Sequence, residues 1–141
     1  MQRQFQEHLD ELLQTLKSTG TDTVSLVAGE WFVWLPGLVT GLNVACRAVG
    51  ETDDDVLTGV PVYPPFLSSP VYSDRRCVRV PLVEDGGRWT FPASALEAAI
   101  TPRSRLFLLC NPQNPVGRAF SREELRALAD VCTAHDLVIC S

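Results

Sequence analysis

Hydrophobic residues along this 141-residue chain recur with two different spacings, and the spacing changes from segment to segment. Apolar side chains that return every three or four positions share one face of a helix. This spacing, with local start signals, predicts helices at residues 2–17, 38–49, 92–100 and 121–135. Short apolar runs bounded by Pro, Gly or charged residues predict strands instead. These runs occupy residues 23–27, 55–60, 77–82, 105–110 and 137–140.

Two of the predicted elements carry further local signals. Ser121 and Glu124 form a capping box, in which the hydroxyl and the carboxylate accept hydrogen bonds from free backbone N–H groups where a helix begins. The apolar run at residues 105–110 is typical of a strand that is covered on both faces of a parallel sheet. Because strands and helices alternate from Val24 onwards, the sequence predicts an α/β fold with a mostly parallel sheet flanked by helices.

The last predicted strand runs up to Ser141, the final residue. Open α/β sheets bind ligands beyond the carboxyl ends of their strands, so a chain that stops there lacks part of its own site. We therefore expect an incomplete domain. We also expect the chain to be poorly soluble, oligomeric or molten, because apolar sheet surface would be left uncovered.

Composition excludes several classes of protein. With 45% hydrophobic and 21% charged residues, the chain can bury a core without disulfides or metals, and it is neither disordered nor collagen-like. The formal charge of −5 and the scattered arginines give no positive surface for nucleic acid. No apolar run approaches the ~20 residues that span a bilayer. We expect a cytoplasmic protein with no nucleic-acid partner and no membrane partner.

The five cysteines are odd in number, far apart and mostly set within apolar stretches. We interpret them as reduced core residues. Cys132 and His135 form the only close mixed pair of potential metal ligands, and two further ligands at zinc-like spacing are missing. The sequence predicts no metal site.

Two loops at the expected ends of strands or starts of helices are candidates for ligand binding. After Pro36 and Gly37, the amides of Leu38 and Val39 would be free at the positive end of a helix dipole, which suits a phosphate. A turn that only enters a helix gives the same pattern. In the second loop, at residues 61–66, prolines would hold Tyr63 in a fixed direction for stacking on a flat ring. A core tyrosine packed between two elements is the alternative, and these residues by themselves favour it.

The loop at residues 111–117 is the most specific of the candidates. Two successive Asn–Pro steps favour extended conformations at both asparagines, and Gly117 permits an unusual turn. We therefore expect the Asn114 side chain to be presented rather than packed. A tight strand-to-helix turn is the structural alternative, but the spacing favours a function.

These motifs, at residues 34–42, 61–66 and 109–118, together carry a resemblance to a known family. Residues 34–141 resemble the large domain of fold-type-I pyridoxal-phosphate enzymes, most closely the branch of cystathionine β-lyase-like C–S lyases and related aminotransferases. The resemblance implies that Gly37, Leu38 and Val39 bind the phosphate of pyridoxal 5′-phosphate. It implies also that Tyr63 stacks on the pyridine ring and that Asn114 binds the phenolic oxygen.

The chain differs from the family in the residues that make the cofactor reactive. The family has an aspartate for the pyridine nitrogen just beyond the position of Ser141, and further downstream a Schiff-base lysine and an arginine for the substrate carboxylate. The only lysine in this chain is Lys17. We therefore assign no catalytic residue. Residues 1–27 match poorly and are interpreted as an amphipathic helix and connector, and residues 28–141 as a partial pyridoxal-phosphate-binding domain, truncated at both ends.

The resemblance implies part of an aminotransferase or C–S β-lyase that acts on amino acids and is a homodimer when complete. The choice between lyase and aminotransferase stays open, and the 141-residue chain alone is expected to be inactive. One alternative is a non-catalytic truncated product that associates with a full-length relative. Another is an unrelated nucleotide-binding α/β module, but the sequence has no Gly-x-Gly-x-x-Gly or Walker-type loop.

Overall fold

The computed structural model describes residues 35–141. The helix predicted at residues 2–17, the strand predicted at residues 23–27, Lys17 and the predicted boundary at residue 27 lie outside this range.

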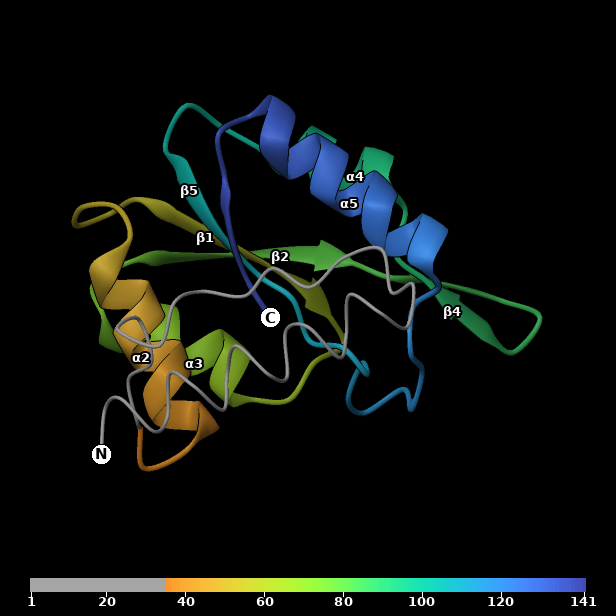
Figure 1. Cartoon of the computed structure of the whole chain (residues 1–141), viewed down its shortest axis with the longest axis horizontal. Helices are drawn as coiled ribbons and strands as arrows, with labels where there is room; N and C mark the ends of the chain where they lie inside the picture. Colours follow the sequence, from red (N-terminus) through yellow and green to blue (C-terminus); the bar gives the residue numbers. More distant parts are fainter. Residues whose placement is uncertain (1–34) are drawn as a thin grey trace, which may run out of the picture. The chain divides into compact units, whose positions relative to one another are not determined.

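A sheet of 4 parallel strands forms the centre of the fold (Figure 1). The strands are β1 Asp55–Val60, β2 Arg76–Pro81, β5 Ser104–Leu108 and β6 Val138–Cys140. Their order across the sheet is β2-β1-β5-β6, so β1 and β5 lie in the middle. The predicted α/β class with a parallel sheet is confirmed.

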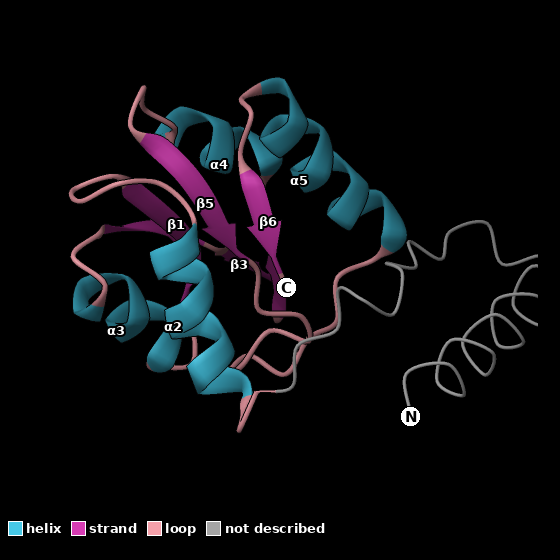
Figure 2. Cartoon of the chain, turned by 60° about the vertical axis from the view of Figure 1, so that its left-hand side comes forward, coloured by secondary structure: helices cyan, strands magenta, loops and turns pink. Residues whose placement is uncertain are grey.

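Helices cover both faces of this sheet (Figure 2). One face carries α2 Leu38–Ala48 and α3 Pro65–Tyr72, and the other carries α4 Ala93–Ala99 and α5 Arg122–Ala134. An antiparallel hairpin of β3 Val83–Asp85 and β4 Arg88–Thr90 lies between β2 and α4 in the chain. None of the helices described within residues 35–141 is long and apolar enough to cross a membrane.

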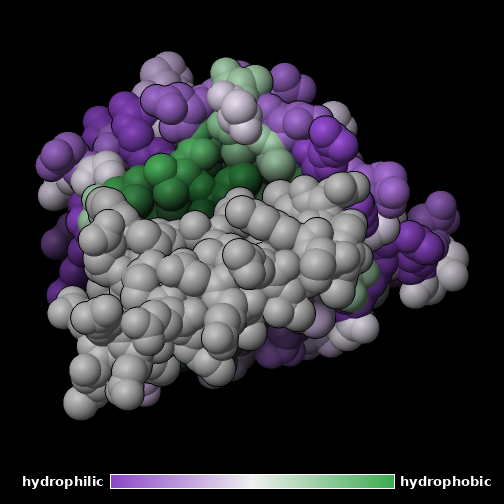
Figure 3. Space-filling view, in the orientation of Figure 1, coloured by the Kyte–Doolittle hydropathy of each residue, from purple (hydrophilic) through white to green (hydrophobic). Residues whose placement is uncertain are grey.

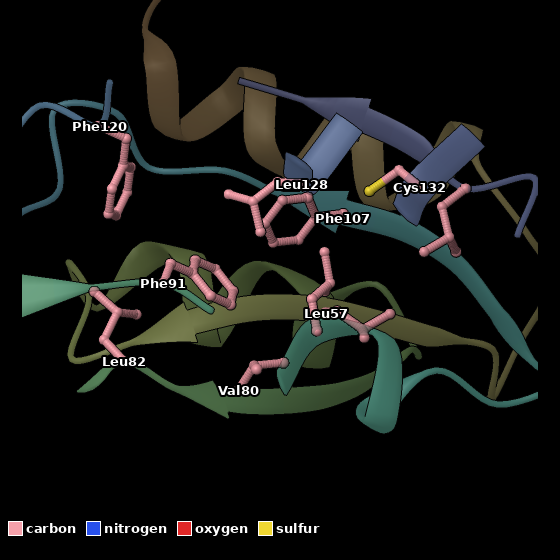
Figure 4. Packing of buried hydrophobic residues seen from close by; sticks show 10 residues of the cluster. Leu57, Val80, Leu82, Phe91, Phe107, Phe120, Leu128 and Cys132 are labelled. Atoms are coloured by element: carbon pink, nitrogen blue, oxygen red, sulfur yellow. The ribbon is translucent and has the colours of Figure 1, made fainter. Parts of the chain in front are cut away.

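Three phenylalanine rings lie among aliphatic side chains in the core beneath α4 and α5 (Figure 4). The ring of Phe91 meets that of Phe107 edge-on with centroids 5.7 Å apart, and its centroid lies 6.4 Å from that of Phe120. Gly59 of β1 lies against this group. A Cβ atom at Gly59 would come within 2.6 Å of the Phe91 ring and 2.7 Å of the Leu82 side chain. The missing side chain is thus a packing requirement in the middle of the sheet.

The core beneath α2 and α3 is mainly aliphatic. Leu42 and Cys46 of α2 pack there with side chains of β1 and β5. Burial raises the pKa of the Cys46 thiol to about 11, so this thiol stays protonated at neutral pH. All five cysteines are free, but only Cys46 and Cys132 are fully buried. The interpretation as reduced core residues therefore holds fully for these two.

Charged residues close the amino ends of the strands. The Asp55 carboxylate is fully buried and accepts hydrogen bonds from Arg76 Nε at 2.7 Å and from Thr101 Oγ1 at 2.6 Å. Next to it, Asp54 accepts a hydrogen bond of 2.8 Å from the Glu51 backbone N–H, and this bond lowers the pKa of Asp54. These side chains satisfy one another, so this edge of the sheet has a structural role.

Every element predicted within residues 35–141 is present to within two residues of its expected ends. The sequence does not predict α3, because Pro64, Pro65 and Pro70 are typical of loops. In the structure Pro65 occupies the first helical position, where a missing N–H group has little cost. The sequence also does not predict β3 and β4, which are too short for a clear alternation and which flank the turn at residues 86–87.

The edge strand β6 carries exposed apolar side chains, in line with the uncovered sheet surface that the sequence leads us to expect. Val138 and Ile139 are 49% and 39% exposed. Among the described residues no strand pairs with the outer side of β6. Figure 3 shows an apolar area on the side of the molecule where β6 lies. The reason is positional, because an edge strand has a neighbour on one side only.

Candidate functional site

The candidate site lies at the carboxyl ends of β1 and β5, where the chain leaves the sheet in opposite directions. From β1 the chain passes to α3 and then to β2, while from β5 it passes to α5 on the other face and then to β6. This divergence is a topological switch point, the position at which open α/β sheets bind ligands. The two loops that part here are the ones that carry Tyr63 and Asn114.

In the loop after β1, Tyr63 and its neighbour Val62 face different surroundings. Val62 is buried, with 8% of its surface exposed, and anchors the loop on the aliphatic core. Tyr63 is 40% exposed, so the alternative of a core tyrosine is wrong. Its carbonyl accepts a hydrogen bond of 3.0 Å from the Phe66 amide at the start of α3, which fixes the backbone of Tyr63. The phenol ring is therefore available to a ligand on a well-held backbone.

The loop after β5 folds back on itself and leaves Asn114 exposed near its turn. At its base the backbone amide of Gln113 donates to the Arg118 carbonyl at 2.7 Å, and the Gly117 amide donates to the Gln113 carbonyl at 2.9 Å. Gly117 has a φ of 67°, a left-handed conformation that favours glycine. Asn111 has a structural role, because its Oδ1 accepts a hydrogen bond of 3.0 Å from the Phe120 amide. The presented side chain predicted at Asn114 agrees with this geometry.

An ion pair ties the end of this loop to α5. Arg118 Nη2 lies 2.7 Å from each carboxylate oxygen of Glu124, and Arg118 also donates to the Trp89 carbonyl. The guanidinium carbon stands 5.2 Å from the centroid of the Phe120 ring. The hydrogen bonds from Arg118 lower the pKa of Glu124. Glu124 completes the capping box with Ser121, as the sequence predicts.

The side chain of Gln113 joins the two loops. It is 2% exposed, and its Nε2 donates to the Pro61 carbonyl at 2.7 Å, with the Gly59 carbonyl at 3.5 Å. Sequence reasoning does not identify this residue, because a glutamine between two prolines is typical of an exposed turn. Only the pairing of β1 with β5 places acceptors beside its amide group.

The N-terminus of α2 lies at the same edge of the sheet. The C-terminal end of α2 lies near the amino ends of the strands, where the Gly50 carbonyl accepts a hydrogen bond of 2.8 Å from Arg75. The helix therefore runs antiparallel to β1, and its N-terminus lies towards the carboxyl ends of the strands (Figures 1 and 2). Leu38 is 67% and Val39 43% exposed. Among residues 35–141 no side-chain hydrogen bond caps the helix at Gly37, and its first turn holds no acidic residue. The free N–H groups of this turn are therefore open to an anion.

Three kinds of group thus meet the carboxyl edge of the sheet: helix N–H donors, an aromatic ring and a carboxamide. They suit a planar ligand that carries an anionic tail and a polar ring substituent. Within residues 35–141 no group of three His, Cys, Asp or Glu side chains is arranged to hold a metal ion.

Known proteins share sequence and fold with this chain. The family model for aminotransferases of class I and II matches residues 1–141. Cystathionine beta-lyase PatB of Bacillus subtilis is 37% identical over 113 residues, which cover 79% of this chain and 29% of PatB.

Two solved structures have the same fold over the matched part. N-succinyldiaminopimelate aminotransferase from Mycobacterium tuberculosis has a TM-score of 0.69 and 33% identity, with 72% of this chain and 26% of that one covered. Cystalysin from Treponema denticola, whose structure contains pyridoxal 5′-phosphate, has a TM-score of 0.74 and 25% identity, with coverage of 92% and 39%. The chain thus spans well under half the length of each of these proteins.

Proposed function

This chain belongs to the class I and II aminotransferase family, and we propose that residues 35–141 hold the cofactor of a pyridoxal-phosphate-dependent aminotransferase or C–S β-lyase. The proposal is supported by the switch point between β1 and β5, whose loops carry the exposed residues Tyr63 and Asn114, and by the α2 N-terminus at the same edge of the sheet. In the complete enzyme the substrates are amino acids and the assembly is a homodimer.

The α2 N-terminus has the properties that a phosphate monoester requires. Gly37 leaves the space beside the helix start open, since a Cβ atom there would meet nothing within 4 Å. The amides of Leu38 and Val39 are the donors, and the first turn has no carboxylate that would repel the anion. We assign the phosphate to these three residues.

Tyr63 and Asn114 suit the ring of the same molecule. The exposed phenol of Tyr63 offers a flat apolar face, and the exposed carboxamide of Asn114 offers an N–H donor to a ring oxygen. Pyridoxal phosphate, when bound, supplies an electron sink for charge that develops at the α-carbon of an amino acid. Residues 35–141 bind and orient it but contain no lysine that could attach it covalently.

We therefore propose that this chain binds the cofactor without performing turnover by itself. Both the lyase PatB and the M. tuberculosis aminotransferase match the chain at similar identity, so both reaction types stay within the proposal. A non-catalytic product that associates with a full-length relative would use the same cofactor contacts.

The test is binding of pyridoxamine 5′-phosphate, which carries an amine and needs no lysine. We expect saturable binding to the full chain, seen as a change in ligand fluorescence and an induced circular dichroism signal, with inorganic phosphate as a competitor. Absence of saturable binding would overturn the proposal. In a second arm, pyridoxal phosphate is added, turnover of cystathionine is assayed, and a separate aliquot is reduced with borohydride to map any adduct. Turnover together with a stoichiometric adduct at Lys17 in the reduced aliquot would contradict the inactivity.

A further inference from the structure

Gln113 is among the largest fully buried side chains of the described residues, and it is polar. A buried carboxamide is costly unless its hydrogen-bonding groups are satisfied. Its Nε2 donates to the Pro61 carbonyl at 2.7 Å, and the Gly59 carbonyl lies 3.5 Å away. Both acceptors belong to the carboxyl end of β1 or to the residue that follows it. The side-chain amide of Gln113 is therefore hydrogen-bonded to the segment that leads to Tyr63.

The backbone of Gln113 forms its hydrogen bonds within the loop that carries Asn114. Its N–H and C=O groups bond to Arg118 and Gly117, which closes the turn that carries Asn114. One residue thus belongs to the Asn114 loop by its backbone and to the Tyr63 loop by its side chain.

The regular pairing of β1 with β5 stops before this point. The last partners in register are Thr58 and Leu108, and Thr58 Oγ1 donates to the Leu108 carbonyl at 3.0 Å. Further along, in the part of the chain that the structure describes, the hydrogen bonds from Gln113 to Gly59 and Pro61 link the two diverging segments. Gln113 therefore sets how far apart the two loops stand.

We propose that Gln113 is a positioning residue for the cofactor: its buried carboxamide fixes the distance between Tyr63 and Asn114. Pro61 lies two residues before Tyr63, and Gln113 lies one residue before Asn114. A change in the hydrogen bond between Gln113 and Pro61 would therefore move both Tyr63 and Asn114, because only a short stretch of chain separates them from the bond. The proposal rests on the proposed function, in which these two residues bind one ring.

The physical consequence is a loss of preorganisation when the bond is absent. The two loops could then move independently, and a ligand that touches both would have to fix their spacing on binding. Affinity for the ring should fall although no direct contact is removed. The phosphate contact at α2 should keep its strength, because no hydrogen bond described within residues 35–141 joins Gln113 to that helix.

The experiment uses the full chain with two variants, Gln113→Met and Gln113→Asn. Methionine keeps the length and volume without a donor, and asparagine keeps the carboxamide but is one methylene shorter. Thr133→Val is the matched control, because it removes a side-chain hydrogen bond of 2.9 Å to the backbone at an exposed site on α5. For each protein we measure the Kd for pyridoxamine 5′-phosphate, the induced circular dichroism, the Kd for inorganic phosphate and the urea unfolding curve.

For both Gln113 variants we expect the Kd for pyridoxamine phosphate to rise roughly tenfold and the induced dichroism to change. The Kd for inorganic phosphate should stay at the wild-type value, and Thr133→Val should resemble wild type throughout. A folded Gln113 variant with wild-type affinity and dichroism would overturn the inference. So would loss of the cooperative unfolding transition in both variants, because the amide would then support the whole fold. Failure of wild type to bind pyridoxamine phosphate is instead failure of the proposed function.

Discussion

At the scale of single residues, the exposed members of the candidate site contribute little to the core. Tyr63 is 40% exposed and Asn114 is exposed, whereas the neighbouring Val62 and Gln113 are buried and hold the loops in place. Exposed side chains away from special backbone positions change the free energy of unfolding by about 0.5 kcal/mol or less when substituted. Binding and folding can therefore be tested separately at these positions.

Asn114→Ala and Tyr63→Ala should each weaken binding of pyridoxamine phosphate by the full chain. A hydrogen bond to a charged oxygen contributes about 1.5–3 kcal/mol, which corresponds to a rise in Kd of roughly ten- to a hundredfold for Asn114→Ala. Fluorescence titration gives the Kd, and the urea midpoint should stay near the wild-type value. Thr133→Val on α5 serves as the control. Unchanged affinity in both variants would show that the two loops are wrongly assigned.

Gly59→Ala tests the close approach inside β1. The new methyl group would lie 2.6 Å from Phe91 and 2.7 Å from Leu82, both of which are buried. Overpacking of this kind costs about 1–3 kcal/mol. The urea denaturation midpoint should fall accordingly with an unchanged slope. A variant as stable as wild type would mean that Phe91 and Leu82 can move aside without loss of packing.

At the scale of elements, α5 and the loop before it act as one unit. Ser121 Oγ accepts a hydrogen bond from the Glu124 amide, the Glu124 carboxylate accepts one from the Ser121 amide, and the same carboxylate binds Arg118. The sequence alone predicts the first two bonds because their partners are three residues apart. The bond to Arg118 closes the Asn114 loop and depends on the path of that loop.

This unit should make stability depend on pH. Hydrogen bonds from Arg118 lower the pKa of Glu124 in the folded chain below its usual value of 4.5. Its contribution is therefore complete above the unfolded pKa and is lost as the pH falls through the lower, folded pKa. Glu124→Gln keeps a side chain that can cap the helix but removes the charge.

The stability difference between wild type and Glu124→Gln should accordingly be constant from pH 7 to about pH 5 and shrink towards pH 3. Thermal unfolding across this range measures it. A difference that grows as the pH falls would contradict the role of the Arg118–Glu124 pair.

At the scale of the whole molecule, the edge of the sheet at β6 exposes apolar side chains of the described residues. Val138 is 49% and Ile139 39% exposed, and among the described residues β6 has a strand neighbour on one side only. Unpaired backbone groups beside apolar side chains favour pairing between copies.

We expect the chain to elute as oligomers in size-exclusion chromatography and to bind a dye for exposed apolar surface. Val138→Lys should lower both signals, because a lysine on an edge strand opposes pairing. Val71→Lys is the matched control, since Val71 is also exposed, at 59%, but lies on α3. A wild-type chain that elutes as a monomer and binds no dye would contradict this prediction.

Much of the fold could be predicted from sequence, and the motifs that suggest the candidate site are visible there too. The parallel α/β order, the capping box at Ser121 and the motifs around Gly37, Tyr63 and Asn114 depend on residues a few positions apart. Such patterns can be recognised without the rest of the chain, because the periodicity of helices and strands and the residue preferences of turns are local properties.

The tertiary structure alone decided those features that depend on residues distant in sequence. Gln113 is buried because β5 lies beside β1 and brings the Pro61 carbonyl to its amide, 52 positions away along the chain. Gly59 is required because Phe91 and Leu82 cross over it. The helix α3 forms in a proline-rich segment because its face packs on α2 and the sheet. Burial and close contact are set by the whole packed chain, whereas the sequence by itself determines which local elements are available to pack.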